Sequence, residues 1–263
     1  MIKYKDIIFQ RKKFVEREIK YKPLSVIKEN IRNTKITADF KSAIQNKSDV
    51  SIISEFKPAS PTKGDISNLL VEEIVPLYEF GGSSAISVLT EEYYFKSNIK
   101  NLNIASLITK LPILRKDFIM GEYQIYEARS CGANAVLLMA DLYKDLSSGI
   151  DLCNYLEMNA LVECKNREEI EKAAKAGAEI IGINNRSFED FSIDFKRTEK
   201  LAKFIPENIL LLSESGVNNG KDVKILGSYG ADAILVGSSL MESSNIKEKL
   251  NELVNAGKDA RLD

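Results

Sequence analysis

The chain contains several short apolar runs that each end in a charged, amide or hydroxyl residue. The runs end at Glu55 and Lys57, at Lys116, at Glu163, at Asn184 and Arg186, and at Ser213 and Glu214. A short apolar run of this kind is typical of a parallel strand that is covered on both faces. Because burying an unpaired charge is expensive, ionisable groups at the same end of several such strands indicate a reaction site.

The spacing of the runs predicts an α/β protein that folds as a single (β/α)8 TIM barrel. The predicted strands begin near Val50, Ala85, Ile113, Ala135, Ala160, Ile180, Ile209 and Ala233. Helical patterns lie between them, for example over 122–131 and 167–176, and this alternation favours a parallel sheet. A length of 263 residues suits one barrel. We therefore expect a single domain over residues 1–263, in which residues 1–47 form an N-terminal helical extension that packs on the barrel.

A glycine repeat marks four of the predicted joints between a helix and the next strand. Gly82, Gly132, Gly177 and Gly230 each follow a helix-like segment and precede small residues and an apolar run. Glycine readily adopts the left-handed conformation that ends a helix. The repeat therefore predicts four tight turns from helix to strand.

The composition excludes several kinds of chemistry and of partner. The chain has no histidine, so acid–base chemistry falls to Lys, Glu, Asp, Tyr or Cys, and histidine-ligated zinc is excluded. Its three cysteines form no C-x-x-C pair, which favours unpaired thiols in a reducing cytosol. A net charge of −1 gives no general attraction to nucleic acid or to an acidic membrane. With no apolar stretch near the roughly 20 residues of a membrane helix and no signal-peptide core, we expect a soluble, cytoplasmic protein.

Polar residues at the strand ends fall into pairs, because side chains two positions apart in a strand lie on the same face. Glu55 is paired in this way with Lys57, and Asn184 with Arg186, while Lys116 ends a third strand. Active sites of TIM barrels form at the carboxyl ends of the strands. The strand ends therefore predict one shared pocket, although a structural network of ion pairs is the alternative for any single residue.

The strand that carries Lys116 has two different faces. Leu114, Lys116 and Phe118 share the face that is directed into the barrel, and Arg115 and Asp117 share the other. The second face points toward the surrounding helices. We therefore predict that Arg115 and Asp117 are structural and bond to other side chains or to the backbone.

Two turns rich in glycine and serine follow the seventh and eighth predicted strands, at 213–216 and 236–239. Backbone N–H groups in such turns can approach an anion closely, and a short helix that begins near Ser238 would add its positive end. Phosphate sites of TIM barrels form at this position. An ordinary pair of loop turns would have a similar composition.

Several motifs together resemble indole-3-glycerol phosphate synthase, an enzyme family of tryptophan biosynthesis. The matching segments are EFKPASP at 55–61, SVLTE at 87–91, LRKDFI at 114–119, GINNR at 182–186, SESG at 213–216 and GSSLM at 237–241. The resemblance covers nearly the whole barrel and implies a carboxy-lyase with no cofactor and no metal. Its substrate, 1-(2-carboxyphenylamino)-1-deoxyribulose 5-phosphate, would cyclise and lose carbon dioxide and water to give indole-3-glycerol phosphate.

The resemblance also implies roles for individual residues. Lys116 is expected to protonate the substrate carbonyl oxygen, with a pKa lowered by cations or an apolar wall. Glu163 is expected near the departing hydroxyl group, and Lys57 with Glu55 is the alternative pair for dehydration. The remaining residues are Asn184 and Glu214 as polar positioning groups, Ser215, Gly216, Gly237, Ser238 and Arg186 as the phosphate cradle, Ser60 as a loop contact, and Phe95, Phe118 and Leu137 as walls around the anthranilate ring.

Two positions depart from the family pattern. Asn185 stands where a small hydroxyl residue is also used, and Phe188 stands where leucine is frequent.

Two other functions stay open from the residues alone. They are a different enzyme on the same barrel, such as a sugar-phosphate isomerase or a Schiff-base aldolase, and a non-catalytic phosphate-binding protein. The expected partner is a small phosphorylated substrate, with no nucleic acid and no membrane. A monomer is expected, and association with other enzymes of the tryptophan pathway is a second expectation.

Overall fold

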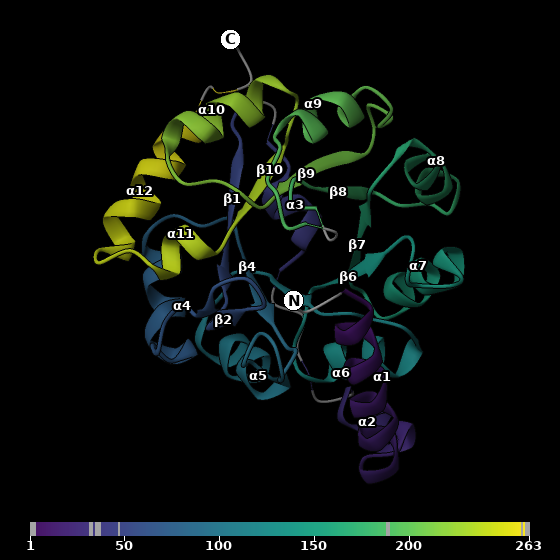
Figure 1. Cartoon of the computed structure of the whole chain (residues 1–263). Helices are drawn as coiled ribbons and strands as arrows, with labels where there is room; N and C mark the ends of the chain where they lie inside the picture. Colours follow the sequence, from purple (N-terminus) through teal and green to yellow (C-terminus); the bar gives the residue numbers. More distant parts are fainter. Residues whose placement is uncertain are drawn as a thin grey trace.

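The computed structural model describes residues 4–31, 34, 38–46, 48–187, 190–258 and 260. A closed barrel of eight parallel strands forms its centre, and helices surround the barrel (Figure 1). The strands are β1 (Ser51–Phe56), β4 (Ala85–Leu89), β5 (Ile113–Lys116), β6 (Ala135–Met139), β7 (Asn159–Cys164), β8 (Ile180–Asn184), β9 (Leu210–Glu214) and β10 (Ala233–Val236). Consecutive strands are neighbours, and β10 pairs with β1 to close the barrel. The predicted fold class and the eight predicted strands are confirmed.

The helices that connect these strands lie on the outside of the barrel. They are α4 (Val71–Phe80), α5 (Ile99–Ile108), α6 (Glu122–Ser130), α7 (Leu146–Tyr155), α8 (Arg167–Lys175), α9 (Lys196–Ala202), α10 (Gly220–Ser228) and α12 (Ile246–Gly257). The helices predicted over 122–131 and 167–176 correspond to α6 and α8. A further short helix, α11 (Ser238–Met241), follows β10, and a small hairpin of β2 (Ala59–Ser60) and β3 (Gly64–Asp65) follows β1.

Glycines with left-handed backbone form the four predicted turns between helix and strand. The angle φ is +91° at Gly82 and Gly132, +90° at Gly177 and +93° at Gly230, a region that residues with a Cβ rarely adopt. A strand begins three residues after each of these glycines. The repeat thus brings the chain into four strands by the same short route.

Alternate residues of the strands face two separate apolar cores. Ile52 and Val162 pack against the surrounding helices, whereas Ile53 and Leu161 pack inside the barrel. The inner core fills the barrel below the polar residues at the carboxyl ends of the strands. Those polar side chains therefore rest on an apolar floor, where charge is costly unless it is paired.

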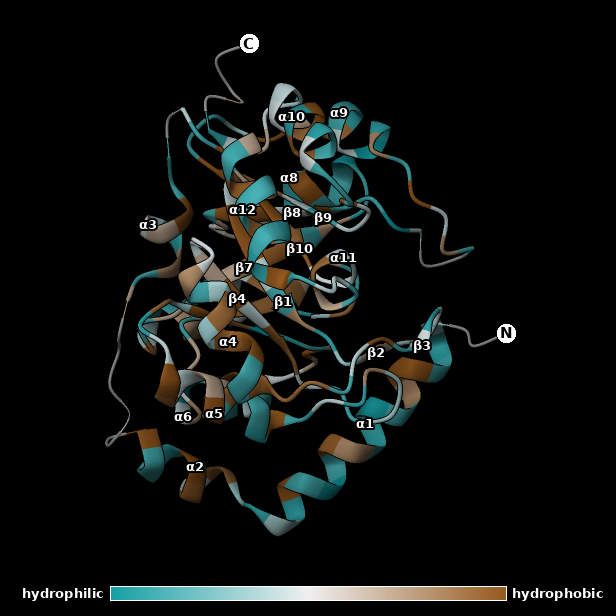
Figure 2. Ribbon diagram, turned by 90° about the vertical axis from the view of Figure 1, so that its left-hand side faces the viewer, coloured by the Kyte–Doolittle hydropathy of each residue, from teal (hydrophilic) through white to brown (hydrophobic). Residues whose placement is uncertain are grey.

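The helices that precede β1 contact both ends of the barrel. They are α1 (Tyr4–Tyr21), α2 (Leu24–Ile31) and α3 (Phe40–Ile44). Phe40 and Ile44 of α3 are fully buried in the inner core, and Figure 2 shows α3 at the end of the barrel opposite the hairpin of β2 and β3. The helix α2 packs on α6, and Ile7 of α1 joins the inner core at the carboxyl ends of the strands.

Candidate active site

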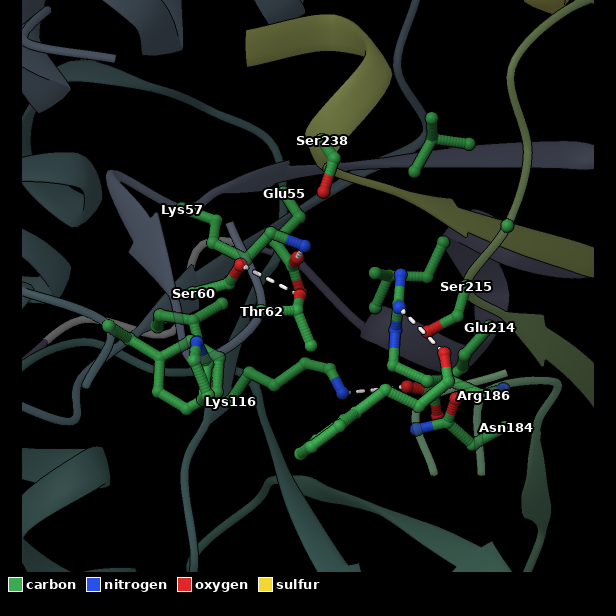
Figure 3. A pocket seen from close by; sticks show the side chains of 18 of the residues that line it. Glu55, Lys57, Ser60, Thr62, Lys116, Asn184, Arg186, Glu214, Ser215 and Ser238 are labelled. Carbon is green, nitrogen blue, oxygen red and sulfur yellow. Dashed lines mark hydrogen bonds and ion pairs between the residues drawn. The ribbon is translucent and has the colours of Figure 1, made fainter. Parts of the chain in front are cut away.

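A cavity of about 390 Å³ lies at the carboxyl ends of the barrel strands (Figure 3). Its lining includes all fifteen of the predicted site residues: Glu55, Lys57, Ser60, Phe95, Lys116, Phe118, Leu137, Glu163, Asn184, Arg186, Glu214, Ser215, Gly216, Gly237 and Ser238. Every strand of the barrel contributes through its last residues or the loop that follows it. The structure therefore brings together residues that lie far apart in the sequence.

Lys116 lies between two buried carboxylates. Its Nζ is 2.7 Å from Oε2 of Glu214 and 3.9 Å from Oε2 of Glu163. The side chain of Asn184 donates to the same oxygen of Glu163 at 3.4 Å. The Oε1 atoms of Glu163 and Glu214 are buried and have no hydrogen-bond partner among the described residues. A substrate or a water molecule would satisfy these two oxygens.

The surroundings of Lys116 and Glu163 raise the pKa of both side chains, for different reasons. Burial lowers the pKa of Lys116, but the carboxylates of Glu214, Glu163 and Glu55 outweigh burial and raise this pKa above its ordinary value. The expectation of a lowered pKa is wrong, because carboxylates rather than cations surround the ammonium group. Burial and repulsion from Glu214 raise the pKa of Glu163 to about 7. Lys116 therefore stays charged, and Glu163 can hold a proton near neutral pH.

A second lysine–carboxylate pair lies near the start of α11. Nζ of Lys57 is 2.9 Å from Oε1 of Glu55, whose side chain is almost fully buried. A Cβ atom built at Gly237 would lie 2.3 Å from Oε1 of Glu55 and 3.1 Å from Nζ of Lys57. Glycine at this position lets the chain after β10 pass close to the ion pair without displacing either side chain.

The turns after β9 and β10, which were predicted to bind phosphate, line one part of the cavity. The angle φ is +71° at Ser215 and +97° at Gly216, which bends the chain sharply after β9. The helix α11 begins at Ser238, as predicted, but it is only four residues long. Individual N–H and hydroxyl groups are therefore better suited than a helix dipole to hold an anion here. Arg186 also lines this cavity, and its Nη1 donates to the carbonyl oxygen of Phe191 at 3.2 Å.

Aromatic and aliphatic side chains form one wall of the cavity. The ring centroids of Phe95 and Phe118 are 6.2 Å apart, with the rings tilted by 48°, and Leu137 lines the same cavity. Phe95 is held by Glu91, whose Oε2 accepts the N–H of Phe95 at 3.1 Å. Two rings with fixed positions can contact a flat aromatic group.

Some residues that line the cavity were missed by the sequence analysis. Met139 could have been found, because it follows Leu137 by two positions in the same strand and so shares its face. Ile7 comes from α1, and Phe191 and Ile193 come from the loop after β8. No pattern in the sequence shows which part of the barrel a helix or loop will reach.

The outer face of β5 carries the predicted structural network. Arg115 is fully buried, and its Nη1 donates to the carbonyl oxygen of Gln124 at 2.7 Å. Its Nη2 pairs with Glu127 at 2.8 Å and with Asp117 at 3.0 Å. The prediction that Arg115 and Asp117 bond to side chains and backbone is confirmed, although Asp117 also reaches the lining of the cavity.

Of the two positions that depart from the family pattern, Asn185 lies outside the cavity lining. Asn185 is fully buried behind β8, where it donates to Oγ of Ser213 at 3.0 Å and accepts from Oγ1 of Thr198 at 2.8 Å. Its amide thus belongs to a buried hydrogen-bond cluster with Ser213 and Thr198. Phe188 lies outside the described residues.

Three further features of the described residues concern metal ligands, cysteine thiols and membrane-spanning helices. No group of three or more His, Cys, Asp or Glu side chains in this part of the chain is arranged to hold a metal ion. Cys131, Cys153 and Cys164 are free thiols, as expected, and burial raises the pKa of Cys153 to about 12. None of the described helices has the length and apolar character that crossing a lipid bilayer requires.

A closed parallel barrel with paired lysines and carboxylates in a cavity at the carboxyl ends of its strands is the arrangement of a TIM-barrel enzyme. The family model described as indole-3-glycerol phosphate synthase matches residues 4–253, and the chain belongs to this family. It is 40% identical over 256 residues to the indole-3-glycerol phosphate synthase of Methanothermobacter marburgensis, with coverage of 97% of this chain and 92% of that protein. It is 38% identical over 255 residues to that of Thermoanaerobacter sp. (strain X514), with coverage of 96% and 97%.

Solved structures with lower sequence similarity share the fold alone. The thiamine phosphate pyrophosphorylase from Pyrococcus furiosus is 15% identical and aligns with a TM-score of 0.61, over 80% of this chain and 96% of that chain. Family membership instead specifies the reaction. The chain catalyses ring closure, decarboxylation and dehydration of 1-(2-carboxyphenylamino)-1-deoxyribulose 5-phosphate to indole-3-glycerol phosphate, a step of tryptophan biosynthesis. An isomerase, an aldolase and a non-catalytic binding protein are thereby set aside.

Proposed function

We propose that Lys116 starts this reaction by donating a proton to the ketone oxygen of the substrate. The ring carbon that carries the carboxylate then bonds to the ketone carbon, and the ketone oxygen becomes a hydroxyl group. Loss of carbon dioxide returns its bonding electrons to the ring. This proposal is supported by the position of Nζ of Lys116, which lies 2.7 and 3.9 Å from two buried carboxylates. These carboxylates keep the ammonium group charged until a substrate oxygen arrives.

Glu163 is the proposed proton donor for the hydroxyl group that leaves as water. The anilino nitrogen pushes this group out, and loss of a proton from the carbon beside nitrogen completes the indole. A pKa near 7 supports Glu163 in this role, because its carboxyl can hold the proton that the departing oxygen needs. Lys57 and Glu55 are the alternative pair. Since they pair with each other at 2.9 Å beside Gly237, the proposed role of Lys57 is to hold the anionic groups of the substrate, while Glu55 fixes the position of Lys57.

The remaining residues are proposed to bind and orient the two ends of the substrate. Asn184 and Glu214 would fix the directions of Glu163 and Lys116, to which they are bonded. The proposed phosphate cradle consists of Ser215, Gly216, Gly237, Ser238 and Arg186. The proposed walls for the anthranilate ring are Phe95, Phe118 and Leu137, and Ser60 is the proposed contact from the loop after β1.

The chain is further proposed to form one domain over residues 1–263, with residues 1–47 as an extension of it. Burial of Phe40 and Ile44 in the inner core supports this division, because the barrel would otherwise expose apolar surface. The proposed location is the cytoplasm, and the proposed working unit is a monomer, since one chain supplies all fifteen site residues. Association with other enzymes of the tryptophan pathway is a separate proposal, which co-elution in size-exclusion chromatography would test.

The direct test is a fluorescence assay, because the indole ring of the product reports its own formation. Purified protein should convert the carboxyphenylamino deoxyribulose phosphate to indole-3-glycerol phosphate with no added cofactor, and a chelator in the same cuvette should leave the rate unchanged. Lys116→Ala should reduce turnover by about 10³-fold, in the range that a general acid contributes. A parent-like rate for Lys116→Ala would contradict the proposed mechanism.

A further inference from the structure

A buried arginine on the N-terminal helix links separate parts of the cavity rim. Arg11 lies on α1, and only 1% of its surface is exposed. Its Nη1 donates to Oε2 of Glu92 at 2.6 Å, and its Nη2 donates to Oδ2 of Asp117. Because the guanidinium group is planar and rigid, it holds two carboxylates from different loops at a fixed separation.

Asp117 transmits this constraint to two residues of the cavity, since it stands between Lys116 and Phe118 in the chain. Its Oδ1 accepts the N–H of Phe118 at 2.8 Å, and its Oδ2 accepts from Arg115 at 3.0 Å. Burial raises the pKa of Asp117, but Arg11 and Arg115 outweigh burial and hold this pKa below its ordinary value. Asp117 is therefore a charged, fully engaged anchor, and the backbone on both sides of it is fixed.

Glu92 transmits the constraint to the other aromatic ring of the wall. It belongs to the turn after β4, in which Glu91 accepts the N–H of Phe95 at 3.1 Å. The ring of Phe95 lies 6.2 Å from that of Phe118. Glu92 is thus adjacent in the chain to the carboxylate that fixes the backbone of Phe95.

The helix that carries Arg11 also contributes to the wall itself. Ile7, one turn before Arg11, lines the cavity, and the ring of Tyr4 lies 6.0 Å from that of Phe118. The helix α1 thus contacts the aromatic wall through Tyr4 and the cavity through Ile7. Arg11 thus forms two ion pairs between α1 and the barrel rim, one with the fully buried Asp117 and one with the partly buried Glu92.

We propose that Arg11 is a positioning residue for ring closure, which holds the aromatic wall and Lys116 in the geometry that the anthranilate end of the substrate requires. This inference rests on the proposed roles of Lys116, Phe95 and Phe118. The competing explanation is that Arg11 only anchors α1 and adds stability. The two differ in their kinetics, because a misplacement of about 1 Å in an active site can cost about a hundredfold in rate.

The test replaces Arg11 with methionine, which keeps the apolar stem and removes both ion pairs. We expect kcat/KM to fall by about tenfold or more. We also expect the affinity for indole-3-glycerol phosphate to weaken about tenfold, while glycerol 3-phosphate, which lacks the ring, binds within about twofold of the parent. Arg17→Met is the matched control: Arg17 also stacks on Phe14, at 4.9 Å against 5.0 Å for Arg11, but its side chain is 53% exposed.

Each variant is assayed below its own unfolding midpoint. If Arg11→Met does not fold, Arg11→Lys takes its place, because it keeps the charge but cannot bridge both carboxylates, and an intermediate loss is expected. The proposal is overturned if the variant has a lower midpoint but parent-like kcat, KM and affinities, or if both ligands weaken equally. Failure of the underlying site assignment has a separate signature, which is a parent-like rate for Lys116→Ala.

Discussion

Lys116 and Lys57 occupy the same cavity with similar exposure, yet their surroundings differ. Their side chains are 14% and 16% exposed, and each ammonium lies within 2.9 Å of a glutamate oxygen. Lys116 has a second buried carboxylate, that of Glu163, at 3.9 Å, whereas Lys57 pairs with Glu55 beside the glycine turn of β10. An ion pair alone therefore does not identify a proton donor. The second buried carboxylate beside Lys116 is the feature on which we base the proposal that Lys116 donates the proton and Lys57 binds the substrate.

Alanine substitutions of the two lysines give the largest expected contrast. Lys116→Ala should lower kcat by about 10³-fold, because it removes the proposed proton donor. Lys57→Ala should act mainly on KM, with an increase of about tenfold to a hundredfold, because it removes a charge that faces the substrate anion. Steady-state fluorescence of the product measures both constants. Equal losses of kcat in the two variants would contradict the proposed division of roles. The control is Lys12→Ala, on the exposed face of α1.

The carboxylates provide the next contrast. Glu163→Gln should lower kcat by about a hundredfold with little change in KM, since glutamine keeps the size of the side chain but cannot supply the proton. Glu55→Gln should instead raise KM, because Lys57 loses its partner. If Glu55→Gln lowers kcat more than Glu163→Gln does, the pair of Lys57 and Glu55 drives dehydration and the proposed assignment is wrong.

The sequence predicted both lysine–carboxylate groups and failed to predict how they differ. Strand ends and i, i+2 spacing depend only on local order, so Glu55, Lys57 and Lys116 could be placed on the inner face of the barrel from the sequence alone. The pKa of Lys116 depends on which carboxylates come within a few ångströms. That distance is determined by the closure of the barrel, and so the sign of the shift was predicted wrongly.

Contacts between the N-terminal helix and the rim also could not be predicted from the sequence. Arg11 and Ile7 lie more than eighty residues from Glu92 and Asp117 in the chain, and Arg11 is one of many charged residues in α1. A charge on a surface helix is ordinarily solvated. Only the three-dimensional packing shows that this arginine is buried at the edge of the cavity.

Alanine at either of two glycines would disturb one of the two lysine–carboxylate groups without removing any charge. A Cβ at position 182 would lie 2.6 Å from Oε1 of Glu214, and one at position 237 would lie 2.3 Å from Oε1 of Glu55. Neither Gly182 nor Gly237 has positive φ, so alanine adds bulk rather than backbone strain. Gly182→Ala should push Glu214 away from Lys116 and lower kcat about tenfold, whereas Gly237→Ala should raise KM about tenfold.

The control for this pair is Gly121→Ala, since a Cβ at position 121 would meet nothing within 4 Å. Its φ of −170° is extended backbone that alanine adopts freely. Both constants should stay within about twofold of the parent, as for most surface substitutions. If Gly182→Ala and Gly237→Ala change the same constant, the two lysine–carboxylate groups act as one unit.

The pH dependence is the smallest expected effect and the most specific to Glu163. Because its pKa is raised to about 7, the acid form required for dehydration is lost as the pH rises through that value, and kcat/KM should decline on the alkaline side. Glu163→Gln should lack this decline at its lower overall rate. The free energy of unfolding should also decrease as the pH rises. A carboxyl with a raised native pKa stabilises the fold below its unfolded pKa, and this contribution disappears as the pH rises through about 7. Urea unfolding from pH 5 to 8 should therefore show the parent losing stability relative to Glu163→Gln, and parallel curves would mean that Lys116 keeps Glu163 ionised throughout.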